Sequence, residues 1–243
     1  MAEIKYKRIL IKLSGEALMG KQSSGIDPAM IEGIAAELGE LRDLGVEIGV
    51  VVGGGNLMRG ASFAEHGIDR VTADHMGMLA TVMNALALRD ILLRRGIDAA
   101  VMSGLAMPQV CETYTQRDAR RRIADGEIVI FAAGTGSPYF TTDTGASLRA
   151  VEIRAELLIK ATKVDGIYDK DPARHADAVR YESLDYEQAI AERLAVMDVA
   201  AMILCNDNAL DLVVCDINRP NALLDLARGN RLGTRVSRNE ARK

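Results

Sequence analysis

The sequence predicts an α/β protein built as a single-domain αβα sandwich around a mostly parallel central sheet. Short, nearly continuous runs of Ile, Val, Leu and Ala alternate with longer helical patterns along the chain. Continuous apolar runs are typical of strands that are covered on both faces, and such strands are usually parallel. No internal repeat, linker or Pro/Ser-rich boundary divides residues 1–243, so we expect one domain with right-handed crossovers.

The expected strands are the apolar, β-branched runs. They are Arg8–Leu13, Val46–Val52, Ala99–Met102, Glu127–Ala133, Glu156–Ala161 and Leu212–Ile217. The first helix is expected to start at Asp27 and Pro28, because Asp is a good N-cap and Pro suits the first helical position, and to end at Gly45. Further helical patterns cover Thr72–Arg95, Gln116–Ala124, Thr144–Ala155, Asp185–Leu194, Val196–Asp207 and Pro220–Ala227.

Charge and cysteine usage narrow the class of protein. The chain carries 30 Lys and Arg against 34 Asp and Glu, a net charge of −4, whereas a duplex nucleic-acid binder normally has a strong basic excess. We therefore expect no nucleic-acid partner. Three scattered cysteines without a CxxC pair fit the reducing cytoplasm. The longest uncharged apolar stretch, Met76–Leu88, is shorter than the roughly 18–20 residues of a membrane span, so no membrane partner is expected.

A lysine inside the first apolar run is the first candidate for chemistry. A buried ammonium group is costly unless it has a partner or an anionic ligand, and Lys12 lies within Ile9–Leu13. The turn at Ser14 and Gly15 would let backbone N–H groups approach an anion. The segment is either a phosphate-binding lysine with a small-residue loop or an edge-strand lysine followed by an ordinary turn.

Three consecutive glycines, Gly53–Gly55, follow the second expected strand. Glycine tolerates positive φ angles and close backbone approach, and ligands gather at the carboxyl ends of strands in open α/β sheets. Arg59 adds a planar cation that suits phosphate. The loop has neither a Walker nor a GxGxxG pattern. A tight strand-to-helix turn explains one glycine but hardly three, so the phosphate interpretation is favoured.

A hydroxyl-rich loop follows the fourth expected strand. It spans Ala133–Asp143 and contains Thr135, Ser137, Thr141 and Thr142. Asp143 precedes a helical pattern, so it is expected to cap that helix. Its functional role would be to hold Lys12 or to order the metal–phosphate geometry, and the two kinds of role are compatible.

The last candidate segment leaves the fifth expected strand at Lys160, Thr162 and Lys163. Asp165 and Gly166 form a hairpin-type turn, so the segment is either a turn between two short strands or a source of cations for phosphate. In the second interpretation Tyr168 offers a flat surface for a purine.

Two glycine loops, a threonine-rich loop and several cations at one sheet edge are what phosphoryl transfer needs, namely positioning and charge neutralisation. The histidines lack metal-ligand spacing, so no protein-held metal site is expected.

Several segments of the sequence resemble the bacterial uridylate kinases, which have the amino acid kinase fold. The resemblance runs from Tyr6 to about Thr234 and rests on Lys12–Leu18, Gly53–Leu57 with Arg59 and Gly60, Asp74–Thr81, Gly134–Gly136, Phe140–Asp143 and Lys160–Gly166. It implies the reaction UMP + ATP → UDP + ADP with Mg²⁺ carried on ATP. It also implies a homohexamer, activation by GTP and inhibition by UTP. An acceptor half at about residues 1–150 and an ATP half at about 151–243 are expected.

The resemblance also assigns residues to each side of the site. On the ATP side it matches Lys12, Leu13, Ser14, Gly15, Gly55, Arg59, Thr162, Tyr168 and Asp171. On the UMP side it matches Gly54, Asp74, Thr135, Gly136, Ser137, Pro138, Tyr139, Phe140, Thr141 and Thr142. Effector responses are expected at Gly20, Lys21, Gln22, Ser23, Ser24, Gly25 and Arg89. Lys12, Asp143 and Lys160 form the expected catalytic set.

Two alternatives stay open at this point. A kinase of the same fold could act on a carboxylate or carbamate, such as acetylglutamate or aspartate, and would differ at Asp74–Thr81 and Thr135–Thr142. A nucleotide sensor could bind without turnover. The intact set of Lys12, Asp143 and Lys160 argues against the sensor, which need not keep all three.

Overall fold

The sheet has the mixed but mostly parallel organisation that the sequence predicts. The computed structural model describes residues 3–58 and 67–239. Among these residues nine strands form one sheet in the order β4-β3-β5-β2-β1-β6-β8-β9-β7, and only the β8–β9 pair is antiparallel. The α/β sandwich expectation is therefore confirmed.

All six predicted strands are present, each within one residue of its expected ends. They are β1 Arg8–Leu13, β2 Glu47–Val52, β3 Ala99–Ser103, β5 Ile128–Ala132, β6 Leu157–Thr162 and β8 Asp211–Asp216. Three short strands were not predicted from the sequence. They are β4 Glu112–Thr113, β7 Ser183–Asp185 and β9 Thr234–Ser237, and they lie toward the two edges of the sheet.

The predicted helices are also present. Gln116–Ala124 matches its expected bounds, and the others differ by up to three residues at one or both ends. They are α1 Pro28–Asp43, α3 Arg70–Arg94, α4 Gln116–Ala124, α5 Thr142–Ile153, α6 Tyr186–Ala191, α7 Val199–Asp207 and α8 Ala222–Ala227. The cap at Asp27 is confirmed, because its carboxylate accepts the N–H of Ala29. A short 3₁₀ helix, η1 Gly15–Met19, was not expected. The start of α7 at Val196 was wrong, because Asp198 caps the helix by accepting the N–H of Ala201.

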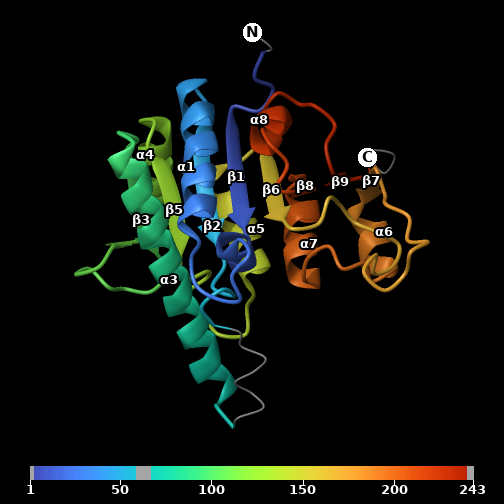
Figure 1. Cartoon of the computed structure of the whole chain (residues 1–243), viewed down its shortest axis with the longest axis horizontal. Helices are drawn as coiled ribbons and strands as arrows, with labels where there is room; N and C mark the ends of the chain where they lie inside the picture. The colour runs from blue at the N-terminus through green and yellow to red at the C-terminus, as the bar shows by residue number, and fades with distance from the viewer. Residues whose placement is uncertain (1–2, 59–66, 240–243) are drawn as a thin grey trace.

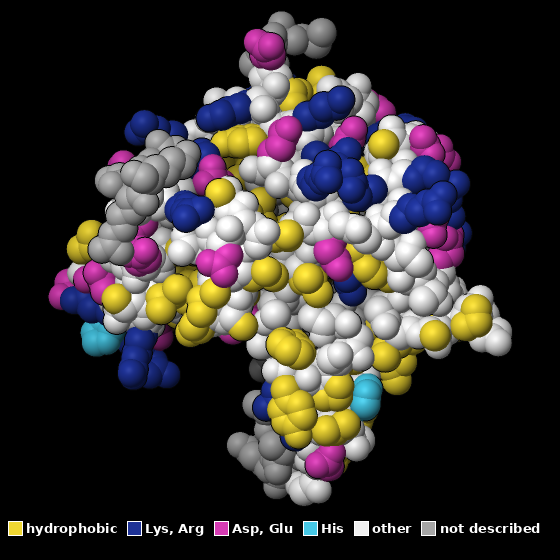
Figure 2. All heavy atoms as spheres, turned by 180° about the vertical axis from the view of Figure 1, so that it is seen from behind, with side chains coloured by type: hydrophobic (Ala, Val, Ile, Leu, Met, Phe, Trp, Pro, Cys, Tyr) yellow, Lys and Arg dark blue, Asp and Glu magenta, His cyan; other side chains and the backbone are white. Residues whose placement is uncertain are grey.

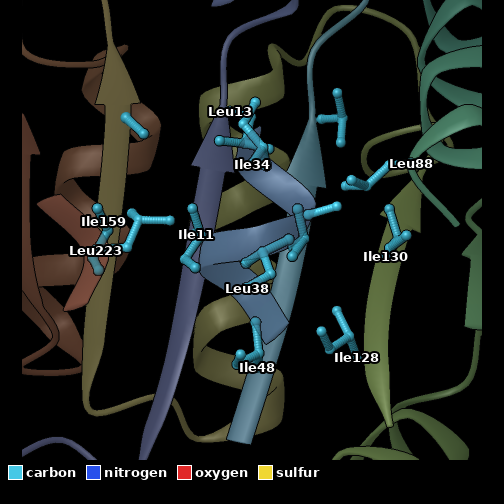
Figure 3. Packing of buried hydrophobic residues seen from close by; sticks show 14 of the residues in the cluster. Ile11, Leu13, Ile34, Leu38, Ile48, Leu88, Ile128, Ile130, Ile159 and Leu223 are labelled. Atoms are coloured by element: carbon cyan, nitrogen blue, oxygen red, sulfur yellow. The ribbon is translucent and has the colours of Figure 1, made fainter. Parts of the chain in front are cut away.

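Helices cover both faces of the sheet. Helices α1, α3 and α8 pack on one face, and α4 to α7 pack on the other (Figure 1). Figure 3 shows the first interface, where Ile11, Ile48 and Ile159 of neighbouring strands lie beside Leu38 of α1 and Leu223 of α8. These five side chains are at most 1% exposed, so the face is a dry apolar core.

Helix α3 is long and apolar enough, by length and composition alone, to cross a membrane. Half of that stretch is buried against the rest of the chain, and core helices of globular proteins pass the same test. Its Leu88 lies in the core of Figure 3, so α3 belongs to the packed sandwich.

Candidate active site

The loops singled out in the sequence meet at one edge of the sheet. Strands β1, β2, β5 and β6 are neighbours and parallel, so their carboxyl ends share an edge. The segments that follow them begin at Ser14, Gly53, Ala133 and Lys163. The expected convergence of the glycine loops and strand-end cations is therefore confirmed, and it occurs where ligands bind in open α/β sheets.

A carboxylate held between two ammonium groups lies at the centre of this edge. The Nζ atom of Lys12 is 3.0 Å from Oδ1 of Asp143, and Nζ of Lys160 is 2.8 Å from Oδ2 of the same residue. Lys12 and Lys160 are register partners on adjacent strands, so their like charges lie side by side. Lys160 also donates to the carbonyl of Val196 at 2.5 Å. Asp143 therefore holds both lysines together, which confirms the expected contact with Lys12.

The charged groups of Lys12, Asp143 and Lys160 are mostly buried, and their mutual interactions shift the pKa values of Asp143 and Lys160. Burial alone would raise the pKa of Asp143, but Lys12 and Lys160 outweigh it and hold that pKa below its usual value. Burial lowers the pKa of Lys160, Asp143 opposes the change, and Lys12 adds to it, so the pKa ends below that of an ordinary lysine. Lys12 is only 8% exposed, so its charge is little screened by water.

Asp143 does not cap α5, contrary to one of the two expected roles. The cap is Thr141, whose hydroxyl accepts the N–H groups of Asp143 and Thr144, and Thr142 is the first residue of the helix. The carboxylate of Asp198, at the start of α7, accepts hydrogen bonds from Thr141 Oγ1 at 2.5 Å and Thr144 Oγ1 at 2.8 Å. Asp198 thereby joins the starts of α5 and α7. Asp198 was not singled out from the sequence, because the expected helix Val196–Asp207 placed it inside the helix rather than at its cap.

The two N-terminal loops fit together only because they contain glycines. A Cβ on Gly15 would lie 2.5 Å from the backbone nitrogen of Gly55, and one on Gly53 would lie 2.9 Å from the nitrogen of Gly15. Gly54 packs against α3 in the same way, since its Cβ would lie 2.8 Å from the carbonyl of Gly77. Leu13, which ends β1, is fully buried beside this contact. The close approach is what an anion-binding backbone requires.

A pair of buried asparagines fixes the triple-glycine loop. Asn56 and Asn84 of α3 exchange side-chain hydrogen bonds of 3.0 and 2.7 Å, and Asn84 also donates to the carbonyl of Gly53. Asn56 donates further to the carbonyl of Gly25. The pair therefore ties α3, the glycine loop and the segment at Gly25 together.

The loop after β5 is attached to the start of α3. The N–H of Tyr139 donates to Asp74 Oδ2 at 2.7 Å, and Arg70 pairs with the same carboxylate at 2.9 Å. Burial acts to raise the pKa of Asp74, but these two contacts lower it overall. Gly136 has a φ of +80° and approaches Gly104 so closely that a Cβ would lie 2.5 Å from its carbonyl oxygen.

The tip of this loop exposes aromatic side chains. Tyr139 is 67% exposed and Phe140 is 52% exposed, with Pro138 just before them. Thr135 accepts the N–H of Ser137 and so closes a small turn at the start of the loop. Seen from behind, hydrophobic side chains gather on the lobe that contains the start of α3 (Figure 2). Apart from Gly54, which lies in the triple-glycine loop, the expected UMP-side residues lie in the segment from β5 to the start of α5 and on α3, which supports it.

The ATP-side residues after β6 lie on an exposed segment. Thr162 ends β6 and closes a turn with Val164, the hydroxyl of Tyr168 donates to Asp165, and Asp171 accepts the N–H of Ala173. No described contact joins Tyr168 or Asp171 to the lysine–aspartate set. Of the two interpretations of Asp165 and Gly166, the turn between two short strands is not what forms, because the segment has only an isolated bridge between Tyr168 and Arg180.

The two expected effector regions are not brought together. Residues 20–25 form exposed turns after η1, whereas Arg89 lines a cavity of about 510 Å³ with residues of β3 and of the segment 108–113. None of residues 20–25 lines that cavity. Arg59, expected on the ATP side, lies outside the described residues.

The site offers little protein coordination for a metal ion. Within residues 3–58 and 67–239, no group of three His, Cys, Asp or Glu side chains is placed to hold one. Oδ1 of Asp143 is buried and accepts no hydrogen bond, although Lys12 is within ion-pair distance. Both oxygens of Asp143 face an ammonium group, so this one carboxylate fits Mg²⁺ that is bound mainly by phosphate and water, as is usual for this ion at phosphate sites.

Comparisons with known proteins agree with this geometry. The model of the amino acid kinase family matches residues 7–216. Uridylate kinase of Xanthomonas euvesicatoria is 54% identical over 236 residues, which cover 97% of this chain and 98% of the relative. Uridylate kinase of Chromohalobacter salexigens is 53% identical over 234 residues, which cover 96% of this chain and 92% of the relative. The solved structure of UMP kinase from Bacillus anthracis superposes with a TM-score of 0.92 at 36% identity, covering 96% of both chains. The solved structure of UMP kinase from Ureaplasma parvum superposes with a TM-score of 0.90 at 35% sequence identity, and the match covers 97% of this chain and all of that chain.

Proposed function

The chain belongs to the amino acid kinase family, and from that membership and the geometry of the site we propose that it transfers the γ-phosphoryl group of ATP to UMP. The observation that carries the proposal is the contact of Lys12 and Lys160 with one carboxylate, beside two loops whose glycines admit phosphate. The names of relatives that match nearly the whole chain supply the acceptor.

The chemistry follows from the charges in the site. An oxygen of the UMP phosphate attacks the γ-phosphorus of ATP in line, and the bond to the β-phosphate oxygen breaks as ADP leaves. Lys12 and Lys160 neutralise the charge on the transferring group, and Asp143 keeps both ammonium groups in place. No general base is required, because the phosphate monoester dianion is already a nucleophile.

Backbone groups position the two nucleotides. Gly15 and Gly55, with Ser14, hold the phosphates of ATP, and Thr162, Tyr168 and Asp171 lie on the adenine side. Gly54, Asp74 and the loop 135–142 hold UMP, and the start of α5 adds the N-terminal end of a helix dipole. The acceptor half then corresponds to about residues 1–150, which also carry the ATP-phosphate contacts at Ser14, Gly15 and Gly55, and the ATP half to about residues 151–243.

Mg²⁺ arrives with ATP in this proposal. Asp143, whose two oxygens pair with Lys12 and Lys160, is the carboxylate that would hold a water of the ion, and the ion would supply charge neutralisation on the phosphates.

A substrate panel tests the reaction. With Mg-ATP, turnover is measured on UMP, CMP, dTMP, aspartate and acetylglutamate. UMP is expected to give the highest kcat/KM by a wide margin. Preferred turnover of either carboxylate would assign the chain to another activity of the fold, and nucleotide binding without turnover would make it a sensor.

Regulation and assembly extend the proposal. We place a GTP activator or UTP inhibitor at the cavity lined by Arg89, because its 510 Å³ volume lies in the range of roughly 300–1,000 Å³ typical of ligand pockets. The turns at residues 20–25 respond through Asn56, which contacts Gly25.

The chain is proposed to act as a homohexamer in the cytoplasm. Helix α3 exposes three large apolar side chains, Leu79, Met83 and Leu93, with Leu79 50% and Met83 58% exposed, and the half-buried Leu86 lies between them at helical spacing. Exposed apolar stripes of this kind are typical of subunit contacts. The three cysteines are free, as in proteins of a reducing compartment.

A further inference from the structure

A cavity rich in basic side chains lies away from the catalytic edge. It has a volume of about 560 Å³, within the range of roughly 300–1,000 Å³ of small-molecule sites. Tyr6, which precedes β1, and Leu157, which opens β6, line it, so it lies toward the opposite ends of these strands from the glycine loops. The segment between α8 and β9, drawn in red in Figure 1, forms another wall.

The charge of this cavity is unusual for a chain with a net charge of −4. The charged residues that line it are Lys5, Arg180, Arg219, Arg231 and Arg235 against the single acidic Glu182. Three of the arginines have carboxylate partners outside the lining, Asp165, Asp225 and Asp211 respectively. Within the described part of the chain, Lys5 and Arg231 form no ion pair. The ammonium of Lys5 instead lies 5.2 Å from the ring centre of Tyr6.

Backbone contacts fix the walls of the cavity. The N–H groups of Lys5 and Tyr6 both donate to the carbonyl of Ala227 at the end of α8. Gly233 has a φ of +68°, and a Cβ there would lie 2.0 Å from the carbonyl oxygen of Val214. The N–H of Arg235 donates to the carbonyl of Glu182. The backbone that carries the cations is therefore held in place by hydrogen bonds and close packing, so the cavity exists before a ligand binds.

We propose that this cavity binds a polyphosphate anion, a compound with two or more linked phosphate groups. A planar guanidinium recognises phosphate oxygens in a two-pronged manner, and four of the five cations are arginines. Lys5 and Arg231 have no carboxylate partner among the described residues, and three further arginines share theirs, so the cavity offers several separate cationic contacts rather than one. A carboxylate or a single phosphate can use few of these contacts, whereas a linked chain of phosphates can reach several of them within this volume. The site is separate from the proposed kinase site and does not depend on it.

Isothermal titration calorimetry with inorganic tripolyphosphate tests the proposal. The titration is done with UMP and a non-hydrolysable ATP analogue at saturation, so that the kinase site is filled. One saturable event per chain is expected, and it should weaken with added salt. The double variant Lys5→Ser/Arg231→Ser should lose about tenfold or more in affinity, because two charge-assisted contacts are removed.

A matched control removes two positive charges elsewhere. Arg117→Ser/Arg121→Ser lies on the exposed face of α4 and should bind tripolyphosphate as the unaltered chain does. Thermal unfolding at an unchanged temperature shows that both double variants are folded. Absence of saturable binding, or equal affinity in the two double variants, overturns the proposal.

Further titrations distinguish a nucleotide from a phosphate chain alone as the ligand of the cavity. A nucleoside triphosphate that binds more tightly than tripolyphosphate, and loses affinity in Lys5→Ser/Arg231→Ser, identifies a nucleotide as the ligand. Equal affinity for the two identifies the phosphate chain alone. Orthophosphate that binds as tightly as tripolyphosphate contradicts the polyphosphate class.

Discussion

At the scale of single residues, Asp143 balances two neighbouring cations. Its carboxylate contacts both Lys12 and Lys160, which are adjacent across the β1–β6 pair. Removal of one member of a buried charged set leaves the others uncompensated, which is far costlier than loss of an exposed ion pair. The carboxylate is therefore expected to matter for folding as well as for turnover.

The substitution Asp143→Asn tests this double role. We expect kcat to fall by about 10²–10³, the scale of one lost electrostatic group, because the lysines lose their common anchor. The free energy of unfolding should fall by roughly 3–5 kcal/mol. Steady-state kinetics and urea unfolding measure the two effects. The double variant Asp143→Asn/Lys12→Met should recover part of the stability without activity, and a single variant as stable as the parent would contradict the argument.

The lowered pKa of Lys160 predicts that stability and activity change in opposite directions as the pH rises into the alkaline range. Because its pKa in the folded chain lies below the unfolded value of 10.5, Lys160 loses its proton in the folded state first. In the window between the two pKa values the unfolded chain binds more protons, so stability contributed by this residue rises with pH. Activity falls over the same window, because the ammonium is lost. In Lys160→Arg the guanidinium stays charged, so both pH-dependent changes should disappear. A pH–rate profile and unfolding at matched pH values check this, and an unchanged alkaline limb in the variant rules it out.

At the scale of elements, α3 supports the loops on the acceptor side. Its first turns carry Asp74, which accepts the N–H of Tyr139, and its middle carries Asn84, which binds the loop at Gly53. The same helix thus sets the position of two loops that follow different strands. A disturbance at its start is expected to affect the acceptor more than the donor.

The substitution Asp74→Asn separates the two substrates. We expect KM for UMP to rise several-fold more than KM for ATP, because the weakened contact loosens the loop 135–142 rather than the loops on the donor side. Initial-rate kinetics with each substrate varied give the comparison. Glu32→Gln, on the exposed part of α1, is the control and should leave both KM values in place. Equal rises in the two KM values would remove the assignment.

The elements that could be predicted from the sequence are those whose pattern of apolar and polar residues reflects how they are buried. The central strands are apolar on both faces, so β1, β2 and β5 were found to within one residue. Strand β4 has two exposed residues and carries no such pattern. The contact between Lys12 and Asp143 was also predictable, because a lysine inside an apolar strand needs a partner. The roles of Asp198 and Asn84 were not predictable, since they depend on contacts with segments far away in the sequence, the start of α5 and the triple-glycine loop.

At the scale of the whole molecule, the apolar stripe of α3 predicts assembly. Met83 lies near its centre and is 58% exposed. Met83→Glu places a charge in the proposed contact, so the assembly is expected to dissociate into smaller species. Analytical ultracentrifugation at matched concentration measures the change. Glu32→Gln, outside the stripe, should sediment as the parent does, and a Met83→Glu variant of unchanged mass would exclude α3 from the contact.

The position of β1 in the middle of the sheet has a consequence for how the chain matures. The first strand to leave the ribosome pairs with β2 on one side within about forty residues, but its other flank stays open until β6 has been synthesised. Lys12 and Lys160 become neighbours only at that late step. A nascent chain halted before residue 157 therefore presents an unpaired β1 edge that chaperones can hold, and it acquires no partial catalysis before the second half arrives.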